Sequence, residues 1–185
     1  MPDAWNEPDV GLVTLVSTRT PGRALDVGCA GGHDALWLAR QGWAVTAIDT
    51  SRHAVSRVRS RAREAGLDVT ALTQDVIELD APGAFDLVSV CYMHLPAAAR
   101  AGMLASASKA LAPGGVLLFR SFDAGMDEAP FDRSLLPTRG AVLAELDDEL
   151  TVQRADVADE FFPYMKKDMK LLTIIAVRAE EASRV

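Results

Sequence analysis

One stretch near the N-terminal end of the sequence decides how this chain folds. It reads Leu25-Asp26-Val27-Gly28-Cys29-Ala30-Gly31-Gly32. The apolar residues up to Val27 predict a buried strand, and the glycines beyond it predict a turn, because glycine adopts left-handed dihedrals at little cost. Periodic apolar residues over 32–41 predict a helix that stops at Gly42. The stretch therefore predicts a strand, a glycine-rich turn and a helix in succession.

The same unit recurs along the chain. Further strands are predicted over residues 44–48, 69–72, 85–91 and 116–119, with helices over 51–66 and 96–111. Strands that alternate with helices favour a parallel sheet, because each strand joins the next through a crossover helix. After a short helix over 140–146, two last strands, at 150–157 and 171–177, are expected to form a hairpin. The predicted fold class is α/β: a Rossmann-like, doubly wound, mostly parallel seven-stranded sheet with a C-terminal antiparallel hairpin.

Length and composition limit the organisation and the partners. A chain of 185 residues fits one domain, which we divide into an N-terminal arm (1–21), a core (22–122), a segment on the substrate side with the hairpin (123–179) and a frayed tail (180–185). A net charge of -7 argues against a nucleic-acid partner. No apolar run approaches the ~18–20 residues of a membrane span. The N-terminus also lacks the pattern of a secretory signal, so we expect a cytoplasmic protein.

In an open parallel sheet, ligands bind outside the carboxyl ends of the strands, so the residues that follow each strand are the candidates. Asp49 lies 21 positions after Gly28, where an acid can accept both hydroxyls of a ribose. Asp75, at the end of the next strand, is placed to meet the amino group of a purine. The glycine turn has Ala30 and His33 where a dinucleotide fingerprint has glycine, and it lacks the lysine of a phosphate-binding loop. These features suggest an adenosine without a phosphate requirement.

The sequence resembles the class I S-adenosylmethionine-dependent methyltransferases over about residues 22–122. The resemblance rests on five ordered motifs: Leu25-Asp26-Val27-Gly28-Cys29-Ala30-Gly31-Gly32, Asp49, Gln74-Asp75-Val76, Phe85-Asp86-Leu87-Val88 and Leu111-Ala112-Pro113-Gly114-Gly115. The stretches 31–39 and 92–96 look most similar to the small enzymes of the tellurite-resistance and thiopurine type. Two positions depart from these patterns, since Ala30 replaces a usual glycine and His33 replaces an arginine common in the tellurite type.

The resemblance implies S-adenosylmethionine as the cofactor, S-adenosylhomocysteine as its product, and methyl transfer to a small-molecule acceptor by in-line displacement. It also implies a cofactor-binding set with distinct tasks: Gly28 and Cys91 at the amino-acid end, Asp49 at the ribose, Asp75 and Val76 at the adenine, and Asp26 ordering the turn. The full set of cofactor residues expected from the sequence is Asp26, Gly28, Cys29, Gly32, Asp49, Thr50, Asp75, Val76 and Cys91.

The acceptor is expected after the fourth strand and the fifth. Tyr92, Met93, His94 and Phe122 are the predicted substrate contacts. His94 is the candidate general base, because its ordinary pKa lies near neutrality, although it could instead cap the helix that starts at Pro96. Aromatic residues in the arm and the C-terminal segments could line an acceptor pocket: Trp5, Phe131, Phe161, Phe162 and Tyr164. The histidines and cysteines show no ligand spacing, so no metal site is expected.

Other functions compete with this interpretation. A catalytically silent cofactor-binding protein, acting as a sensor or a partner subunit, is the main alternative. A methyltransferase for protein or RNA would need a recognition domain or a basic groove, for which the chain has little room. A nicotinamide oxidoreductase is disfavoured by the missing glycines. A homodimer is possible, because a sheet that ends in a hairpin offers an edge that could pair.

Overall fold

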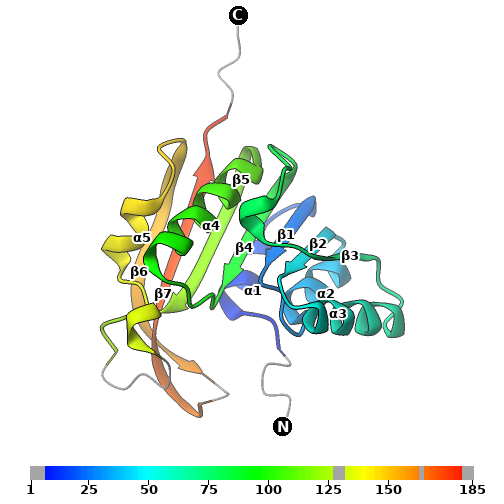
Figure 1. The fold of residues 1–185 in the computed structure, drawn as a ribbon, viewed down its shortest axis with the longest axis horizontal. Helices are drawn as coiled ribbons and strands as arrows, with labels where there is room; N and C mark the ends of the chain where they lie inside the picture. Colours follow the sequence, from blue (N-terminus) through cyan, green and yellow to red (C-terminus); the bar gives the residue numbers. More distant parts are fainter. Residues whose placement is uncertain (1–6, 127–131, 163–164, 181–185) are drawn as a thin grey trace, which may run out of the picture.

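The computed structural model describes residues 7–126, 132–162 and 165–180 (Figure 1). The strands are β1 Arg23–Val27, β2 Ala44–Asp49, β3 Val69–Thr73, β4 Phe85–Cys91, β5 Leu111–Phe122, β6 Leu150–Phe162 and β7 Lys167–Arg178. The helices are α1 Val10–Val16, α2 His33–Arg40, α3 Arg52–Glu64, α4 Ala97–Ala110 and α5 Arg139–Glu145, with short 3-10 turns η1 Val76–Glu78 and η2 Arg133–Leu135. None of the described helices is both long and apolar enough to cross a membrane.

The seven strands form one sheet in the order β3-β2-β1-β4-β5-β7-β6. Strands β1 to β5 pair in parallel, whereas β7 runs antiparallel to both of its neighbours. The predicted fold class is therefore confirmed, including the antiparallel hairpin. The strand order reverses between β1 and β4, and this switch point is where open α/β sheets bind their ligands.

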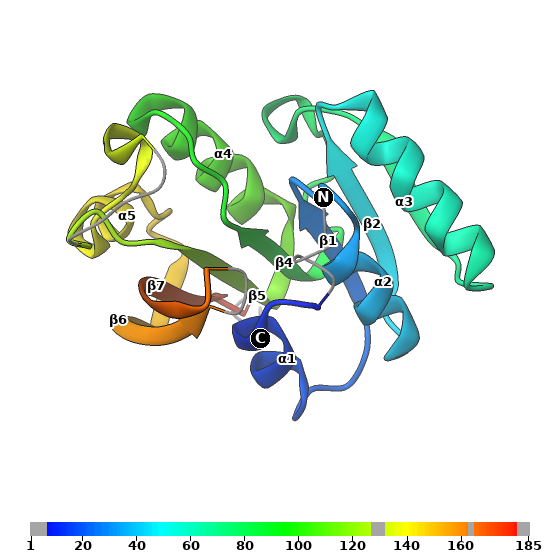
Figure 2. The same cartoon turned by 90° about the horizontal axis from the view of Figure 1, so that it is seen from below.

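Helices cover both faces of the sheet, and each face has its own apolar core (Figure 2). Helices α4 and α5 cover one face through buried residues such as Met103 and Val142. Helices α1, α2 and α3 cover the other, where Leu12, Leu38 and Val58 are completely buried. The central strands are apolar on both faces, as a sheet covered by helices on both sides requires.

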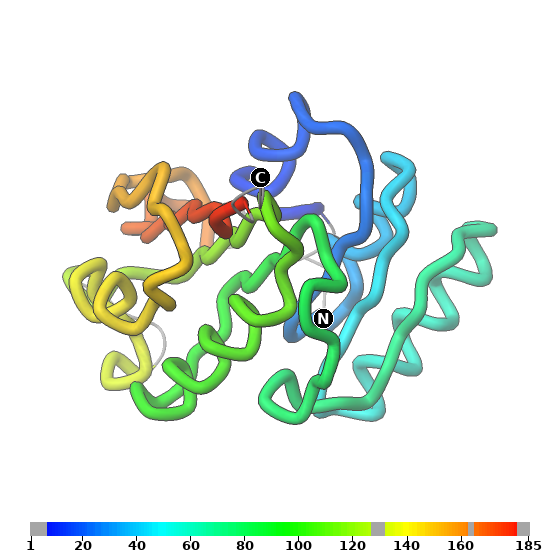
Figure 3. The backbone as a smooth tube through the Cα atoms, turned by 90° about the horizontal axis from the view of Figure 1, so that it is seen from above, coloured from blue at the N-terminus to red at the C-terminus, as the bar shows by residue number. Residues whose placement is uncertain are grey.

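The Arg-rich helix α3 lies at the opposite end of the molecule from the β6–β7 hairpin (Figure 3). Ser51 caps it by accepting a hydrogen bond from the Ala54 backbone, as its sequence predicts. Two of its arginines are structural, because Arg59 donates to the carbonyl of Ala71 and Arg61 to the carbonyl of Gly31. The guanidinium groups thus fasten α3 to β3 and to the glycine turn.

The structure differs from the sequence prediction at both ends of the chain. The N-terminal arm contains a helix, α1, that the sequence did not predict. Its seven residues are too few to be stable alone, so the burial of Leu12 and Val16 stabilises it. Strands β6 and β7 are longer than expected, since their pairing continues to Phe162 and Lys167. The additional residues include several charged side chains, which an antiparallel edge with one solvated face tolerates.

Candidate active site

The glycine turn after β1 is held to the end of β2. The backbone N–H groups of Gly28 and Cys29 both donate to the carbonyl of Ile48, at 2.9 and 3.0 Å. Gly28 and Gly32 adopt positive φ values of 72° and 78°, which glycine tolerates. Ala30 also has a positive φ, of 43°. Alanine in this conformation costs about 1–2 kcal/mol, so the departure at position 30 is accommodated with backbone strain.

Side chains crowd both faces of this turn. A Cβ atom placed on Gly28 would lie 2.2 Å from Sδ of Met93, and one on Gly32 would lie 2.8 Å from Cγ2 of Val58. With their positive φ values, these close contacts disfavour any residue with a side chain at the two positions. Met93 covers the face of Gly28 to which a ligand would come close, so the flexible Met93 side chain has to turn away when a ligand binds there.

Asp49, at the end of β2, shapes the turn as well as facing it. Its Oδ2 accepts a hydrogen bond from Ala30 N–H at 3.0 Å, and its Oδ1 accepts from Ser51 N–H at 2.8 Å. A carboxylate oxygen has two acceptor sites, so each oxygen can still accept a hydroxyl. Thr50 is exposed beside it. The arrangement fits a vicinal diol, such as that of a ribose.

Asp75 and Val76 follow β3 at the same edge of the sheet. Gln74 N–H donates to the carbonyl of Asp49 at 3.0 Å, which joins the ends of β2 and β3. Asp75 caps η1 by accepting from Ile77 N–H, also at 3.0 Å, and Val76 is buried behind it. A purine needs a polar partner for its amino group and an apolar surface for its ring. Asp75 and Val76 are residues of these two kinds, and they lie next to each other.

One carboxyl group and two thiols, those of Asp26, Cys29 and Cys91, lie close to the glycine turn. Asp26 is only 3% exposed, and its Oδ2 has no hydrogen-bond partner among the residues that the structure describes. Burial and the neighbouring Asp34 raise its pKa well above the ordinary value. Burial also raises the pKa of Cys29 to about 12 and raises that of Cys91. Both thiols are therefore protonated at neutral pH and are poor nucleophiles.

His33 lies on the other side of the turn, next to α3. Its Nε2 is 2.9 Å from Nη1 of Arg61, which also donates to the carbonyl of Gly31 at 2.8 Å. A Cβ atom on Gly31 would come within 2.8 Å of the His33 ring. The departure at position 33 therefore places an imidazole, held by an arginine from α3, against the glycine turn.

Tyr92 begins the segment after β4, on the side where the acceptor is expected. It has a positive φ of 58°, and its N–H donates to the carbonyl of Arg120 at 2.8 Å. Its ring lies 5.2 Å from that of Phe122 and 5.7 Å from that of Phe162. The three rings form an aromatic cluster at the ends of β4, β5 and β6.

His94 lies beside this aromatic cluster. Its ring centroid is 5.7 Å from that of Phe122, and burial lowers its pKa. The imidazole is therefore neutral at pH 7, the form that a general base requires. Of the other aromatic candidates, Phe161 is 63% exposed, while Trp5, Phe131 and Tyr164 lie outside the described residues.

Sequence reasoning missed Asp9, Asp34 and Arg120, which form a buried polar network beside these residues. Asp9 N–H donates to Oδ1 of Asp34 at 2.7 Å, and Arg120 Nε lies 3.3 Å from the Asp9 carboxylate. A single arginine inside the apolar run of β5 was the available signal, because a buried arginine requires an acidic partner.

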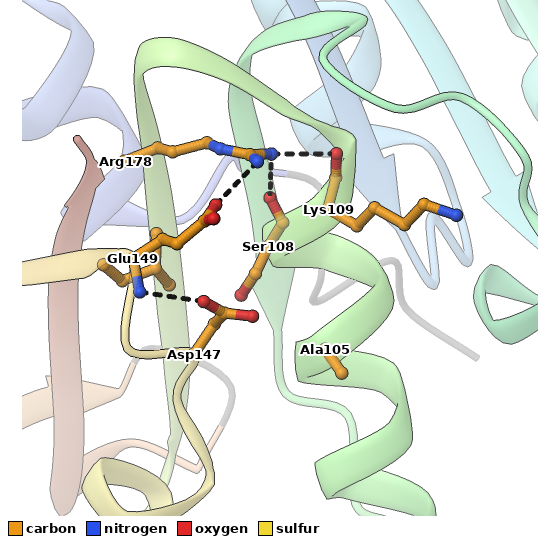
Figure 4. Close-up of a pocket in the computed structure, with 7 residues that line it drawn as sticks. Ala105, Ser108, Lys109, Asp147, Glu149 and Arg178 are labelled. Carbon is orange, nitrogen blue, oxygen red and sulfur yellow. Dashed lines mark hydrogen bonds and ion pairs between the residues drawn. The ribbon is translucent and has the colours of Figure 1, made fainter. Parts of the chain in front are cut away.

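A separate pocket of about 310 Å³ lies at the opposite edge of the sheet, between α4 and the first residues of β6. Figure 4 shows the Arg178 guanidinium pointing at the last carbonyls of α4 and at Glu149. The last carbonyls of a helix have few N–H partners within the helix, so Arg178 supplies a further donor at the C-terminus of α4. The polar groups of this pocket are therefore used in structural contacts.

Comparison with known proteins identifies the family. Residues 24–115 match the family model described as a methyltransferase domain. The chain belongs to the class I S-adenosylmethionine-dependent methyltransferases. A ubiquinone biosynthesis O-methyltransferase from Xanthomonas euvesicatoria pv. vesicatoria is 36% identical over 115 residues, which cover 58% of this chain and 47% of that protein. The chain spans about half the length, or less, of the curated methyltransferases that it matches.

Solved methyltransferase structures share the fold. TehB from Haemophilus influenzae matches with a TM-score of 0.78 and 15% identity over 93% of this chain and 62% of that one. The N-methyltransferase NodS from Bradyrhizobium japonicum WM9, solved with S-adenosylhomocysteine, matches with a TM-score of 0.72 and 21% identity over 92% of this chain and 85% of that one. The described part of this methyltransferase therefore has the family's architecture from α1 to β7.

Proposed function

We propose that this protein transfers a methyl group from S-adenosylmethionine to a small-molecule acceptor by in-line displacement. The observation that carries the proposal is the position of Asp49. Its Oδ2 contacts the glycine turn at Ala30 N–H, its Oδ1 contacts Ser51 N–H, and both oxygens retain acceptor sites. Strand β2, which Asp49 ends, lies next to β1 and the switch point where this fold binds its ligands. The residues also fit the cofactor elsewhere, since Gly28 has no side chain and would allow a backbone contact once Met93 turns away, and Asp26 holds a buried oxygen without a partner among the described residues.

The proposed cofactor residues divide the binding task among four strand ends. The Gly28 and Cys91 backbone would hold the amino-acid end, Asp49 the ribose, and Asp75 with Val76 the adenine. When bound, S-adenosylmethionine supplies a methyl group that its own sulfonium charge already activates. The protein has therefore to align the acceptor and exclude water rather than activate the methyl group.

On the acceptor side, we propose that Tyr92, Met93, His94 and Phe122 contact the substrate. Phe122 offers an apolar wall, and the half-buried neutral His94 can accept a proton from a hydroxyl or amine acceptor. A thiolate or another soft nucleophile would need no base, and His94 would then only shape the pocket. Residues 123–179 would complete the acceptor side, and residues 22–122 the cofactor side.

The experiment that tests this function is calorimetric titration with S-adenosylhomocysteine of the wild-type protein, Asp49→Ala and Asp49→Asn. Micromolar binding by the wild type that is lost in both variants supports the site. The matched control is Asp148→Ala, an exposed acid in the turn before β6. The absence of binding by folded wild-type protein refutes the cofactor assignment.

Turnover separates the enzyme from the silent sensor. A screen that starts with thiols, metalloid oxyanions and phenols, and follows S-adenosylhomocysteine formation, supports the enzyme if any acceptor is methylated. Binding without turnover across the screen favours the sensor or partner subunit.

The assignment to the tellurite and thiopurine type, the cytoplasmic location, the absence of a nucleic-acid partner and the homodimer stay predictions. The free edge of β6 carries a bulge between Val152 and Arg154 and an exposed ion pair between Arg154 and Asp156. Both features disfavour edge-to-edge pairing of sheets, so a dimer is more plausible through another surface.

A further inference from the structure

A buried group of charges lies beside the candidate active site, and the proposed chemistry does not use it. Arg120 is 2% exposed, and the Asp9 side chain is 3% exposed. The Arg120 guanidinium donates to both oxygens of Glu160, at 2.9 Å each, and to Thr173, while its Nε faces Asp9 at 3.3 Å. Buried charges are costly unless they are paired with opposite charges. Removing the Asp9 side chain therefore takes away one of the two carboxylates that balance the charge of Arg120.

Asp9 makes contacts with four parts of the chain. Its Oδ1 accepts from Leu12 N–H at 2.8 Å and caps α1. Its Oδ2 accepts the Tyr92 hydroxyl at 2.7 Å, and its own N–H donates to Asp34 at 2.7 Å. Together with the contact to Arg120, these bonds join the N-terminal arm to α2, to the end of β4 and to β5.

The first turn of α1 is shaped to lie against Arg120. A Cβ atom on Gly11 would stand 2.8 Å from Arg120 Nε, so this position has to remain small for α1 to lie this close. Leu12 and Val16 are buried on the same side. Figure 2 shows α1 and the short blue segment that leads into it next to β4 and β5.

The contacts of Asp9 reach the amino-acid end of the candidate cofactor site. Asp34 belongs to the first turn of α2, directly after the glycine turn, and the Cys91 side chain lies close enough to influence its pKa. Cys91 follows Val90, which pairs with Val27 just before Gly28. Asp9 therefore joins the first turn of α2 to the end of β4, next to the strand ends where Gly28 and Cys91 would hold the amino-acid end of the cofactor.

We propose that Asp9 is a positioning residue that fastens the N-terminal arm across the amino-acid end of the cofactor site and fixes Tyr92 beside the acceptor. The inference rests on the function proposed above. With Asp9 in place, the arm slows the release of the cofactor, and exchange requires the bonds to Asp34 and Tyr92 to open. Tyr92 depends on this contact because its left-handed conformation is strained without a partner.

The test is the rate at which radiolabelled S-adenosylhomocysteine leaves the full-length protein during a chase with unlabelled ligand. Asp9→Ala removes every side-chain contact, and we expect release about tenfold faster, the effect of losing ~1.4 kcal/mol from hydrogen bonds to a charged group. Asp9→Asn retains an acceptor oxygen and is expected to restore part of the wild-type rate. Thr14→Ala, an exposed position on α1, is the matched control and is expected to release at the wild-type rate.

Hydrogen exchange of amides 10–16 without ligand reports arm docking independently, and we expect faster exchange in Asp9→Ala only. An Asp9→Ala protein that exchanges faster in α1 but releases the ligand at the wild-type rate overturns the proposal, because the arm would then be structural only. Should Asp9→Ala fail to fold, Tyr92→Phe removes only the hydrogen bond from the Tyr92 hydroxyl to Asp9. The proposal requires that this variant also releases S-adenosylhomocysteine faster than the wild type. Failure of the wild type to bind refutes the proposed function itself and is seen without any variant.

Discussion

Replacing Asp34 by asparagine tests how the buried acids beside the glycine turn control stability. Asp34 is surrounded by Asp9 from the arm, Asp26 from β1, Cys91 from β4 and Arg120 from β5. Burial raises its pKa from 3.8 to about 6. At about 1.4 kcal/mol for each pKa unit, the ionised form of Asp34 destabilises the folded state by about 3 kcal/mol relative to the protonated form.

The sign follows from proton linkage. Between about pH 4 and pH 6 the folded protein binds more protons at Asp34 than the unfolded chain does, so this contribution to stability is present at low pH and is lost as pH rises through 6. Asp34→Asn cannot ionise, but its Oδ1 can still accept the hydrogen bond from Asp9. The stability of Asp34→Asn relative to the wild type should therefore increase by up to about 3 kcal/mol between about pH 4 and pH 7.

Urea unfolding, followed by tryptophan fluorescence at several pH values, gives the difference in the free energy of unfolding between Asp34→Asn and the wild type. The contributions of the other acids are common to both proteins and largely cancel in this difference. Asp148→Asn, an exposed acid, is the control and should show a difference that does not change with pH. A difference between Asp34→Asn and the wild type that stays constant across this range would show that Asp34 titrates as an ordinary carboxyl, and the account of the buried acids would be wrong.

Two further predictions concern the glycine turn and the thiols. Ala30→Gly should raise the free energy of unfolding by about 1 kcal/mol, because glycine adopts the positive φ of 43° without strain. Urea unfolding at constant pH measures the change, and a loss of stability would show that Ala30 is not strained. Cys29, with its pKa raised to about 12 from 9.0, should react with iodoacetamide at pH 8 at least about 100-fold more slowly in the folded protein than in urea. Cys91 should also react slowly in the folded protein, because its pKa is raised as well. Mass spectrometry of the alkylated peptides measures both rates. Equal rates in the folded protein and in urea would contradict this prediction.

The parts of the fold that could be predicted from the sequence are those with local signals. The positive φ values of Gly28 and Gly32, the cap at Ser51 and the apolar run of β4 each depend on residues close by in the sequence. The strand ends that carry Asp49 and Asp75 followed from this order, because parallel strands end at the same edge of the sheet.

The parts that could not be predicted depend on distant residues. Helix α1 is held by the burial of Leu12 and Val16 and by the contact of Asp9 with Arg120, 111 positions later, and neither Asp9 nor Arg120 alone indicates the other. Likewise, Met93 covers Gly28 through the conformation of one flexible side chain, which no spacing in the sequence specifies. Local patterns thus predicted the candidate site, whereas the docking of Asp9 against Arg120 depends on tertiary contacts.

The order of the last three strands has a consequence for synthesis of the chain. Strand β7 lies between β5 and β6, so β6 has no partner in the sheet until residues 167–178 have left the ribosome. Until then β5 is an open edge whose residues from Val116 to Phe122 are all buried in the finished protein and, apart from Arg120 and Ser121, are apolar. Such an edge is a template for strand pairing between chains. A nascent chain that stalls before residue 167 is therefore exposed to aggregation, and the insertion of β7 closes the sheet.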